Sequence, residues 1–411
     1  MKTLDNTHCT KKIIKKSLII NYLIELLTPD QVDKTAFRDL VSFMLGILLT
    51  TPHNSTLSFS KTVLGAGDAS NLNKSLHAYA DLYQQVHLFS IIQAIIWCTG
   101  FKEVRPGTPV YVSVDEVFLP KSKKQKSLPY VYYCAYKKQW GFYLVVAHVQ
   151  IGKYHLSAGF RIYNPKNEKS KQTLALELVN FLAPHLKQFC KVTFLADSAY
   201  AEKNLMRYVI EGCCWTWISG IKQNRLSDGK SVRRRFKYLS NSHYQSVCMY
   251  KRKFVASSYV GHLKDFSEVG LFVVTKTKKR TSTPVSWRYY YCSDQSLSVQ
   301  EVLRLYENRW RIENDFWTLK EHLAIDDFRY RDESAVQTYL SLVFLVYNWI
   351  CHEKNASVRR MKQSEIGYGC GPTIVRLRSW IGAFFHMFGT DGLRILQEEF
   401  RTARSRQGGF G

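Results

Sequence analysis

The sequence predicts an α/β protein in which a mixed β-sheet is preceded by an all-helical N-terminal region and followed by C-terminal helices. Three observations favour this class. Apolar residues recur at helical spacing through the first hundred positions, strand-like alternation begins near residue 108, and helical spacing returns after residue 298. We therefore divide the chain into a helical N-terminal region (1–105), a first core segment (106–219), a basic β-rich insertion (220–292), a core-completing segment with a long helix (293–352), and a C-terminal helical region with a basic tail (353–411).

The composition indicates a folded and strongly basic protein. The 411 residues carry 58 Lys and Arg against 33 Asp and Glu, a net charge of +25. A positive surplus of this size favours a polyanionic partner, most commonly nucleic acid. The longest apolar run stops at about 12 residues, short of the roughly 18 that span a bilayer, so we expect no membrane association and a cytoplasmic location. The ten cysteines form no C-x-x-C pair, which is typical of reduced core thiols.

The N-terminal region contains three longer predicted helices, at 13–27, 31–49 and 82–98. Between them, a short helix at 57–64, a glycine turn and a second helix at 69–78 resemble a helix-turn-helix. The second helix would expose amide and basic side chains to base edges, namely Asn71, Asn73, Lys74 and His77. A plain helical hairpin explains the same residues.

The core segment begins with alternation of Val110, Val112 and Val114 with polar neighbours, which predicts a strand. Two further strands at 130–136 and 142–149 would complete an antiparallel meander. The expected order then continues as a helix at 173–186, a strand at 192–196, a helix at 202–210 and a strand at 214–219.

The insertion concentrates positive charge. Residues 219–280 hold 15 Lys and Arg against 3 Asp and Glu, and strand-like runs occur at 254–260, 271–275 and 287–292. A single charge run is commonly a solvated loop, but the whole segment favours a phosphate-binding surface. The residues expected to contribute are Arg233, Arg234, Arg235, Lys251, Arg252 and Lys253.

The C-terminal part opens with a capping box, Ser298 and Glu301, which predicts a long helix through Glu321. Two further helices are expected at 335–351 and 373–388. The last residues, RTARSRQGGFG, are expected to form a frayed basic tail.

Three carboxylates are candidates for two-metal phosphodiester chemistry: Asp115 in the first strand, Asp197 after a later strand, and Glu313 in the long helix. An Asp after a strand also serves commonly as a turn or helix cap. Glu116 would replace Asp115 if the strand began one residue later, but the valine alternation favours Asp115. The remaining nearby acids are interpreted as structural or exposed, namely Asp294, Asp315, Asp326 and Asp327.

The long helix places Tyr306, Arg309, Glu313 and Lys320 in one stripe about 60° wide, at about 100° per residue. A carboxylate flanked by cationic side chains could bind a metal ion while the cations bind neighbouring phosphates. An exposed, salt-bridged stripe accounts for the geometry equally well.

The spacing of these four residues reproduces the Y-R-E-K signature, so residues 108–352 resemble DDE transposases of the insertion-sequence-four family. Asp197-Ser198-Ala199-Tyr200 is similar to the second-Asp motif of that family, and Asp115 to its first Asp. The resemblance implies a ribonuclease H-like core in which Asp115, Asp197 and Glu313 are catalytic and bind two Mg²⁺ ions, with Mn²⁺ able to replace them.

The resemblance also implies that Tyr306, Arg309 and Lys320 grip phosphates near the cleaved end. The partners would be double-stranded DNA, both terminal inverted repeats and target, and a second copy of the chain on paired ends. In some members a Trp from the insertion stabilises a flipped base, and Trp287 is the candidate here. A core Trp in a strand is the competing interpretation of Trp287.

The expected function is therefore a cut-and-paste DNA transposase of a bacterial insertion sequence, associated with the nucleoid. Two alternatives stay open. One is a transposase-derived DNA-binding protein without catalysis, and the other is a ribonuclease H-like nuclease that cleaves without joining strands. The presence of all three carboxylates together with Arg309 and Lys320 favours the active transposase.

Overall fold

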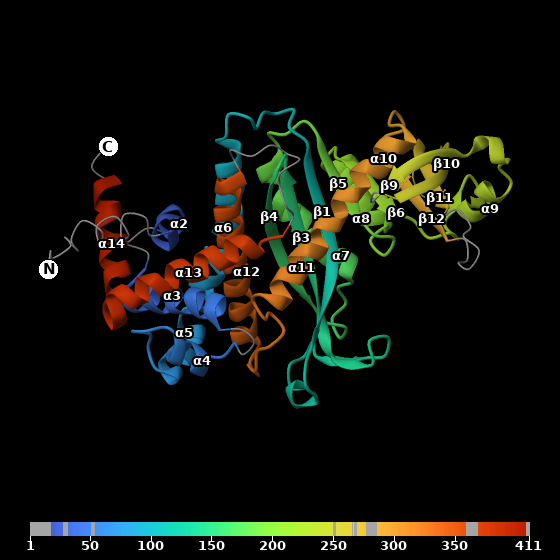
Figure 1. The fold of residues 1–411 in the computed structure, drawn as a ribbon. Helices are drawn as coiled ribbons and strands as arrows, with labels where there is room; N and C mark the ends of the chain where they lie inside the picture. The colour runs from blue at the N-terminus through green and yellow to red at the C-terminus, as the bar shows by residue number, and fades with distance from the viewer. Residues whose placement is uncertain are drawn as a thin grey trace.

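The computed structural model describes residues 18–27, 32–50, 54–249, 252–264, 266, 269–276, 286–358 and 369–407. The fold is mixed α/β, as predicted, with a large sheet between N-terminal and C-terminal helices (Figure 1). The helices before the sheet are α2 (Leu18–Leu26), α3 (Lys34–Leu49), α4 (Thr56–Thr62), α5 (Ala69–Ala78) and α6 (Ala80–Thr99).

Ten strands of the described residues form one sheet, in the order β2-β3-β1-β5-β6-β12-β11-β10-β9, with β4 paired to β3. Strand β1 lies antiparallel to β3 and parallel to β5, and β5 lies parallel to β6. The strands of the core are β1 (Val110–Pro120), β2 (Tyr132–Cys134), β3 (Gln139–Ile151), β4 (Tyr154–Tyr163), β5 (Val192–Ala196) and β6 (Thr216–Gly220).

The insertion extends the core sheet instead of forming a sheet of its own. Its last strand, β12, pairs with β6, and the remaining insertion strands follow outward from β12. Because the pairing is continuous, the first residues of β12 lie beside the ends of the core strands. The insertion strands are β9 (Gln245–Met249), β10 (Arg252–His262), β11 (Val269–Lys276) and β12 (Trp287–Cys292), with a small hairpin of β7 (Leu226–Ser227) and β8 (Lys230–Ser231) and a short helix α9 (Val232–Lys237).

Several local expectations differ from the structure. The meander has a fourth strand, β4, which the sequence analysis missed, and the predicted strand at 130–136 is only the short β2. The predicted helix at 202–210 is α8 (Lys203–Arg207) followed by a π-helical turn, η3 (Tyr208–Gly212). Helix α7 (Lys171–Leu186) agrees with the prediction and carries Pro184 in its last turn.

The expected long helix after Ser298 is interrupted. The capping box of Ser298 and Glu301 opens α10 (Val299–Tyr306), a 3₁₀ turn η5 (Glu307–Trp310) follows, and α11 (Arg311–Glu321) completes the segment. The expected frayed tail is also helical as far as Gln407. The C-terminal helices are α12 (Glu333–Val358), α13 (Gly371–Phe388) and α14 (Gly392–Gln407).

Two layers of helices cover the sheet. On one face, Val110, Val112 and Val114 pack in a cluster with apolar residues of α7 and α8. On the other face, Leu195 and Ile218 pack against α10, and α11 contacts β1. The alternation of β1 therefore directs Asp115 toward α11, away from the valine face.

Helix α12 is the core helix of the protein. It is long and apolar enough to cross a membrane by length and composition, but 89% of its most apolar window is buried within the protein. Its side chains satisfy the backbone of β4: Asn348 accepts a hydrogen bond from the Ser157 amide at 3.1 Å, and Asn355 pairs with both backbone groups of His155. These contacts cover the otherwise unpaired edge of β4.

The N-terminal helices include the predicted pair α4 and α5. Asp68 caps α5 by accepting from the Asn71 amide at 2.9 Å, and Asn71, Asn73, Lys74 and His77 are exposed as expected. The helical pair is confirmed, whereas sequence reading by α5 stays a prediction.

Close packing of α3 on α4 generates a stability prediction. A Cβ atom at Gly46 of α3 would lie 2.5 Å from the Cδ1 of the buried Phe59 in α4. Gly46→Ala should therefore lower the free energy of unfolding by about 1 to 3 kcal/mol, measured by urea denaturation. Gly382→Ala in α13 is the matched control, because a Cβ there meets nothing within 4 Å and should be neutral or stabilising by up to about 1 kcal/mol. Equal losses in both variants would contradict this account of the α3–α4 contact.

Candidate active site

The two aspartates come together through the pairing of β1 with β5. The strands are parallel with Val114 opposite Ala196, so Asp115 and Asp197 follow at neighbouring positions of the register. Asp197 begins the turn after β5 and accepts a hydrogen bond from the Ala199 amide at 2.7 Å. Two carboxylates from distant parts of the chain therefore lie at one place on the sheet.

Arg309 joins the first aspartate to the glutamate. Its guanidinium donates to Asp115 Oδ2 at 2.7 Å and to Glu313 Oε1 at 2.9 Å. The Arg309 side chain is only 11% exposed, so the two charge-assisted hydrogen bonds lie largely out of water. Arg309 thereby holds Glu313 beside β1. The Glu313 carboxylate contacts the Arg309 guanidinium and does not contact Asp115 directly.

The neighbouring Glu116 points elsewhere. Its carboxylate accepts from Lys171 Nζ at 2.8 Å and from the Tyr200 hydroxyl at 2.9 Å. Asp115, and not Glu116, therefore faces the Glu-bearing helix, whereas the catalytic role of Asp115 stays a prediction.

Burial gives Asp115 an unusual proton affinity. Loss of hydration raises its pKa to about 6, Arg309 opposes this rise, and the nearby carboxylates of Asp197 and Glu116 add to it. Arg309 carries one positive charge between the carboxylates of Asp115 and Glu313, and Asp197 adds a third carboxylate near Asp115, so these acids outweigh the charge of Arg309. Carboxylate oxygens are the hard donors that Mg²⁺ and Mn²⁺ prefer, and a local negative surplus favours a divalent cation.

A cavity of about 470 Å³ opens beside these residues, between the ends of β5 and β6, the start of β12, and η5. Trp287 lines it and is 40% exposed, so the interpretation of Trp287 as a core residue is wrong. Tyr306 lines it as well and packs edge-on against Tyr290, with ring centroids 4.9 Å apart. Asp197 and Arg309 complete the set of predicted residues that the cavity brings together.

Trp310 and Arg288 are among the cavity residues that the sequence did not predict. Trp310 follows Arg309 in η5 and is half exposed, and Arg288 follows Trp287 in β12. Neither Trp310 nor Arg288 belongs to a motif. The sequence indicates them only by their position next to the predicted residues Arg309 and Trp287. Both add an aromatic or cationic group next to the carboxylates.

Lys320 lies away from this cavity. It is seven residues after Glu313, about 10 Å along the axis of α11. Burial lowers its pKa, and its charged neighbours include Asp326 and Lys137. Glu313 and Lys320 nevertheless share one face of α11, since seven residues turn an α-helix by about 700°, close to two full turns. The predicted stripe is interrupted only at η5, which carries Arg309.

The basic residues of the insertion fall into two groups. Arg233 and Arg234 of α9, and Arg252 and Lys253 of β10, are exposed. Arg235 instead folds back and donates to the Asp228 carbonyl at 3.0 Å, so its expected role on the surface is not supported. Lys251 lies outside the described residues.

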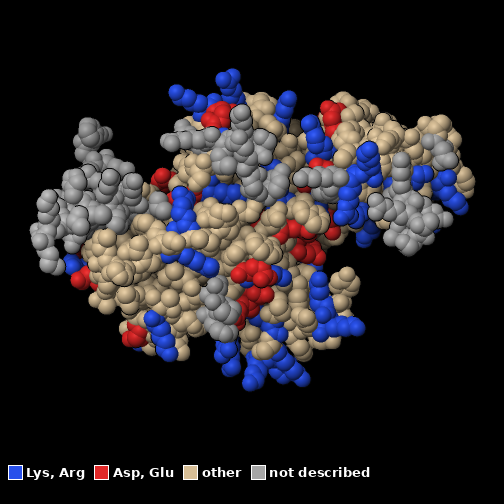
Figure 2. All heavy atoms as spheres, in the orientation of Figure 1, with Lys and Arg blue, Asp and Glu red and all other residues tan. Residues whose placement is uncertain are grey.

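Figure 2 shows acidic side chains gathered over α11, with basic side chains on either side.

The other acids have structural roles, as expected. Asp315 is buried and pairs with His148 Nδ1 at 2.5 Å and with the Tyr347 hydroxyl at 2.6 Å. Asp294 accepts from the Ser296 amide in a turn. Asp326 and Asp327 are partly exposed in the loop after α11.

Comparison with known proteins identifies the family of the chain. The family model of the transposase DDE domain matches residues 106–349, more than half of the chain. The chain is also similar to a solved cryo-EM structure of the piggyBac transposase synaptic complex with hairpin DNA, at 13% identity and a TM-score of 0.48, over 90% of this chain and 79% of that one. Among curated proteins, none matches. The chain belongs to the DDE-domain transposases.

Proposed function

We propose that the chain is a cut-and-paste DNA transposase of the insertion-sequence-four type with the Y-R-E-K signature. It would bind the terminal inverted repeats of its element, cleave phosphodiester bonds there and join the 3′ ends to target DNA. The observation that carries the proposal is the bridge from Arg309 to Asp115 and Glu313, next to Asp197, because three separate chain segments bring these groups together beside a cavity that Asp197 and Arg309 line.

The carboxylates are the groups for holding metal. Members of the family use divalent metal ions, and we propose Mg²⁺, replaceable by Mn²⁺, held by Asp115, Asp197 and Glu313. Two such ions, when bound, supply the activation of water and of a 3′-hydroxyl for in-line attack on phosphorus. Arg309 positions the two carboxylates that it bridges and stands beside the cavity in which a phosphate would lie.

The cavity suits a DNA end. Trp287 offers a partly exposed ring beside Asp197 and Arg309, and stacking of an unpaired base on such a ring contributes about 1 to 3 kcal/mol. Exposed cations of α9 and β10 would hold the flanking duplex through its phosphates. A homodimer on paired ends, and a bacterial cytoplasm as the place of action, complete the proposal.

Two alternatives predict different products. A derived DNA-binding protein would bind element ends and leave them intact, and a nuclease would yield only hydrolysed ends. Arg309 supplies one positive charge against the two carboxylates that it bridges, so the site keeps a negative surplus that a divalent cation would offset, and this favours catalysis.

Glu313→Gln tests the catalytic assignment. Loss of an outer-shell partner of a metal typically costs 10- to 100-fold, so loss of a direct ligand should reduce cleavage by more than about 100-fold. Binding to the element end should stay within about twofold, because no positive charge is removed. Glu321→Gln, at the exposed end of the same helix, is the matched control and should keep both activities. Cleavage by Glu313→Gln at the control rate would refute the role of Glu313.

Arg233 and Arg234 test the phosphate-binding surface. Replacing both with Ala should reduce the slope of log affinity against log salt by about 0.9 for each DNA phosphate that these arginines neutralise. The double variant of Arg394 and Arg401 on α14, which also exchanges two exposed arginines for Ala, should keep the slope of the parent. Identical slopes in all three proteins would place the phosphate-binding residues outside α9.

A further inference from the structure

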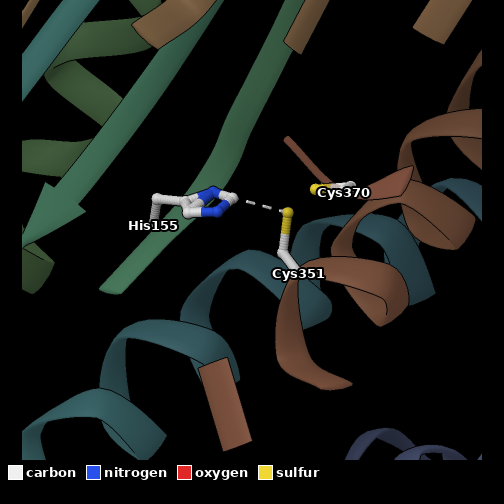
Figure 3. A group of neighbouring side chains, drawn as sticks. All are labelled: His155, Cys351 and Cys370. Carbon is white, nitrogen blue, oxygen red and sulfur yellow. Dashed lines mark hydrogen bonds between the residues drawn. The ribbon is translucent and has the colours of Figure 1, made fainter. Parts of the chain in front are cut away.

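A second cluster of possible metal ligands lies outside the active site. His155 of β4, Cys351 of α12 and Cys370, which directly precedes α13, are all buried, and one ligand atom from each lies within 4.8 Å of the others. Figure 3 shows the imidazole directed at the Cys351 sulfur, with Cys370 beside it. Neither the transposase reaction nor the DNA-binding surface uses these residues.

The backbone around the cluster is firmly held. The Asn355 side chain accepts from the His155 amide at 3.3 Å and donates to the His155 carbonyl at 2.8 Å. Asn355 lies one turn after Cys351 on α12, so the same helix face that presents the sulfur also fixes the strand residue opposite it. The approach of His155 to Cys351 is therefore built into the junction of α12 with β4.

We propose that His155, Cys351 and Cys370 bind one Zn²⁺ ion. The His155 Nδ1 lies 3.7 Å from the Cys351 Sγ. Zinc bonds of about 2.1 Å to nitrogen and 2.3 Å to sulfur at a tetrahedral angle place two such ligands about 3.6 Å apart. Two thiolates and one neutral imidazole are a soft ligand set that selects zinc over Mg²⁺, and two thiolate charges neutralise the ion. The described residues supply three of the four tetrahedral ligands.

The surroundings shift the pKa values of the three side chains in different directions, and burial raises the pKa of the Cys351 thiol well above its usual range. Zinc binding therefore has to displace the proton of Cys351. Burial lowers the pKa of His155 well below its usual range, so the ring is the neutral form that ligates metal. A hydrogen bond with Cys351 and the charge of Lys354 lower the pKa of the Cys370 thiol despite its burial. The ring of His148 stacks on His155 with centroids 5.8 Å apart.

The site would fasten the C-terminal helices to the catalytic sheet. His155 belongs to the edge strand β4, Cys351 to the core helix, and Cys370 to the start of the last helical region. A zinc ion at this junction would add binding free energy to the folded state alone. The role is structural and independent of the Mg²⁺ proposed for the carboxylates.

Zinc content of the full-length protein, purified from zinc-supplemented cells, tests the proposal. Mass spectrometry should find one zinc per chain in the parent, and its loss in Cys351→Ser and in His155→Gln. The matched controls are Cys98→Ser, which removes another buried free thiol, and Glu313→Gln, which alters the carboxylate site; both should retain the zinc. Chelation should lower the melting temperature of the parent and leave that of Cys351→Ser unchanged.

Three outcomes would overturn the proposal. They are a parent protein without zinc, zinc retained in Cys351→Ser, and an intact mass that shows Cys351 and Cys370 joined in a disulfide. If the serine variant does not fold, cobalt substitution of the parent decides the question. Thiolate-to-cobalt absorption supports the site, and its absence from the cobalt-loaded parent refutes it.

Discussion

Carboxylates withdrawn from water are stable next to one another only when a cation offsets their charge, and Arg309 does this for Asp115 and Glu313. The two acids lie far apart in the chain, so the guanidinium also ties the Glu-bearing helix to the first strand. The break of that helix into α10, the η5 turn and α11 places Arg309 over β1 and β5. The geometry of the candidate site thus depends on one buried cation and on the turn that carries it.

Continuity of the sheet joins this site to the insertion. Because β12 pairs with β6, the insertion is anchored on the core, and Trp287 at the start of β12 reaches the cavity that Asp197 and Arg309 line. A freely tethered insertion would leave that ring without a fixed position. On the opposite edge of the sheet, α12 covers β4 through Asn348 and Asn355, and the proposed zinc cluster lies at this same junction.

Much of this arrangement could be predicted from local pattern. The strand that ends at Ala196, the capping box at Ser298 and the Y-R-E-K spacing are short-range features, and the first two agree with the structure. The interruption at 307–310 could not be predicted, because the segment contains no glycine or proline that would break a helix. Two other features depend on contacts between distant parts of the chain. They are the pairing of β12 with β6 and the approach of the three candidate zinc ligands, and no local sequence spacing predicts either.

The central claim is that Asp115, Asp197 and Glu313 act as one catalytic site that joins DNA ends. Its most direct test is Mg²⁺-dependent cleavage and strand transfer on DNA carrying the sequences that flank the coding region. The account predicts cleaved and joined products for the parent and for Asp294→Asn, a turn residue, and none for Asp197→Asn. Joined products from Asp197→Asn, or hydrolysed ends without joining from the parent, would contradict it.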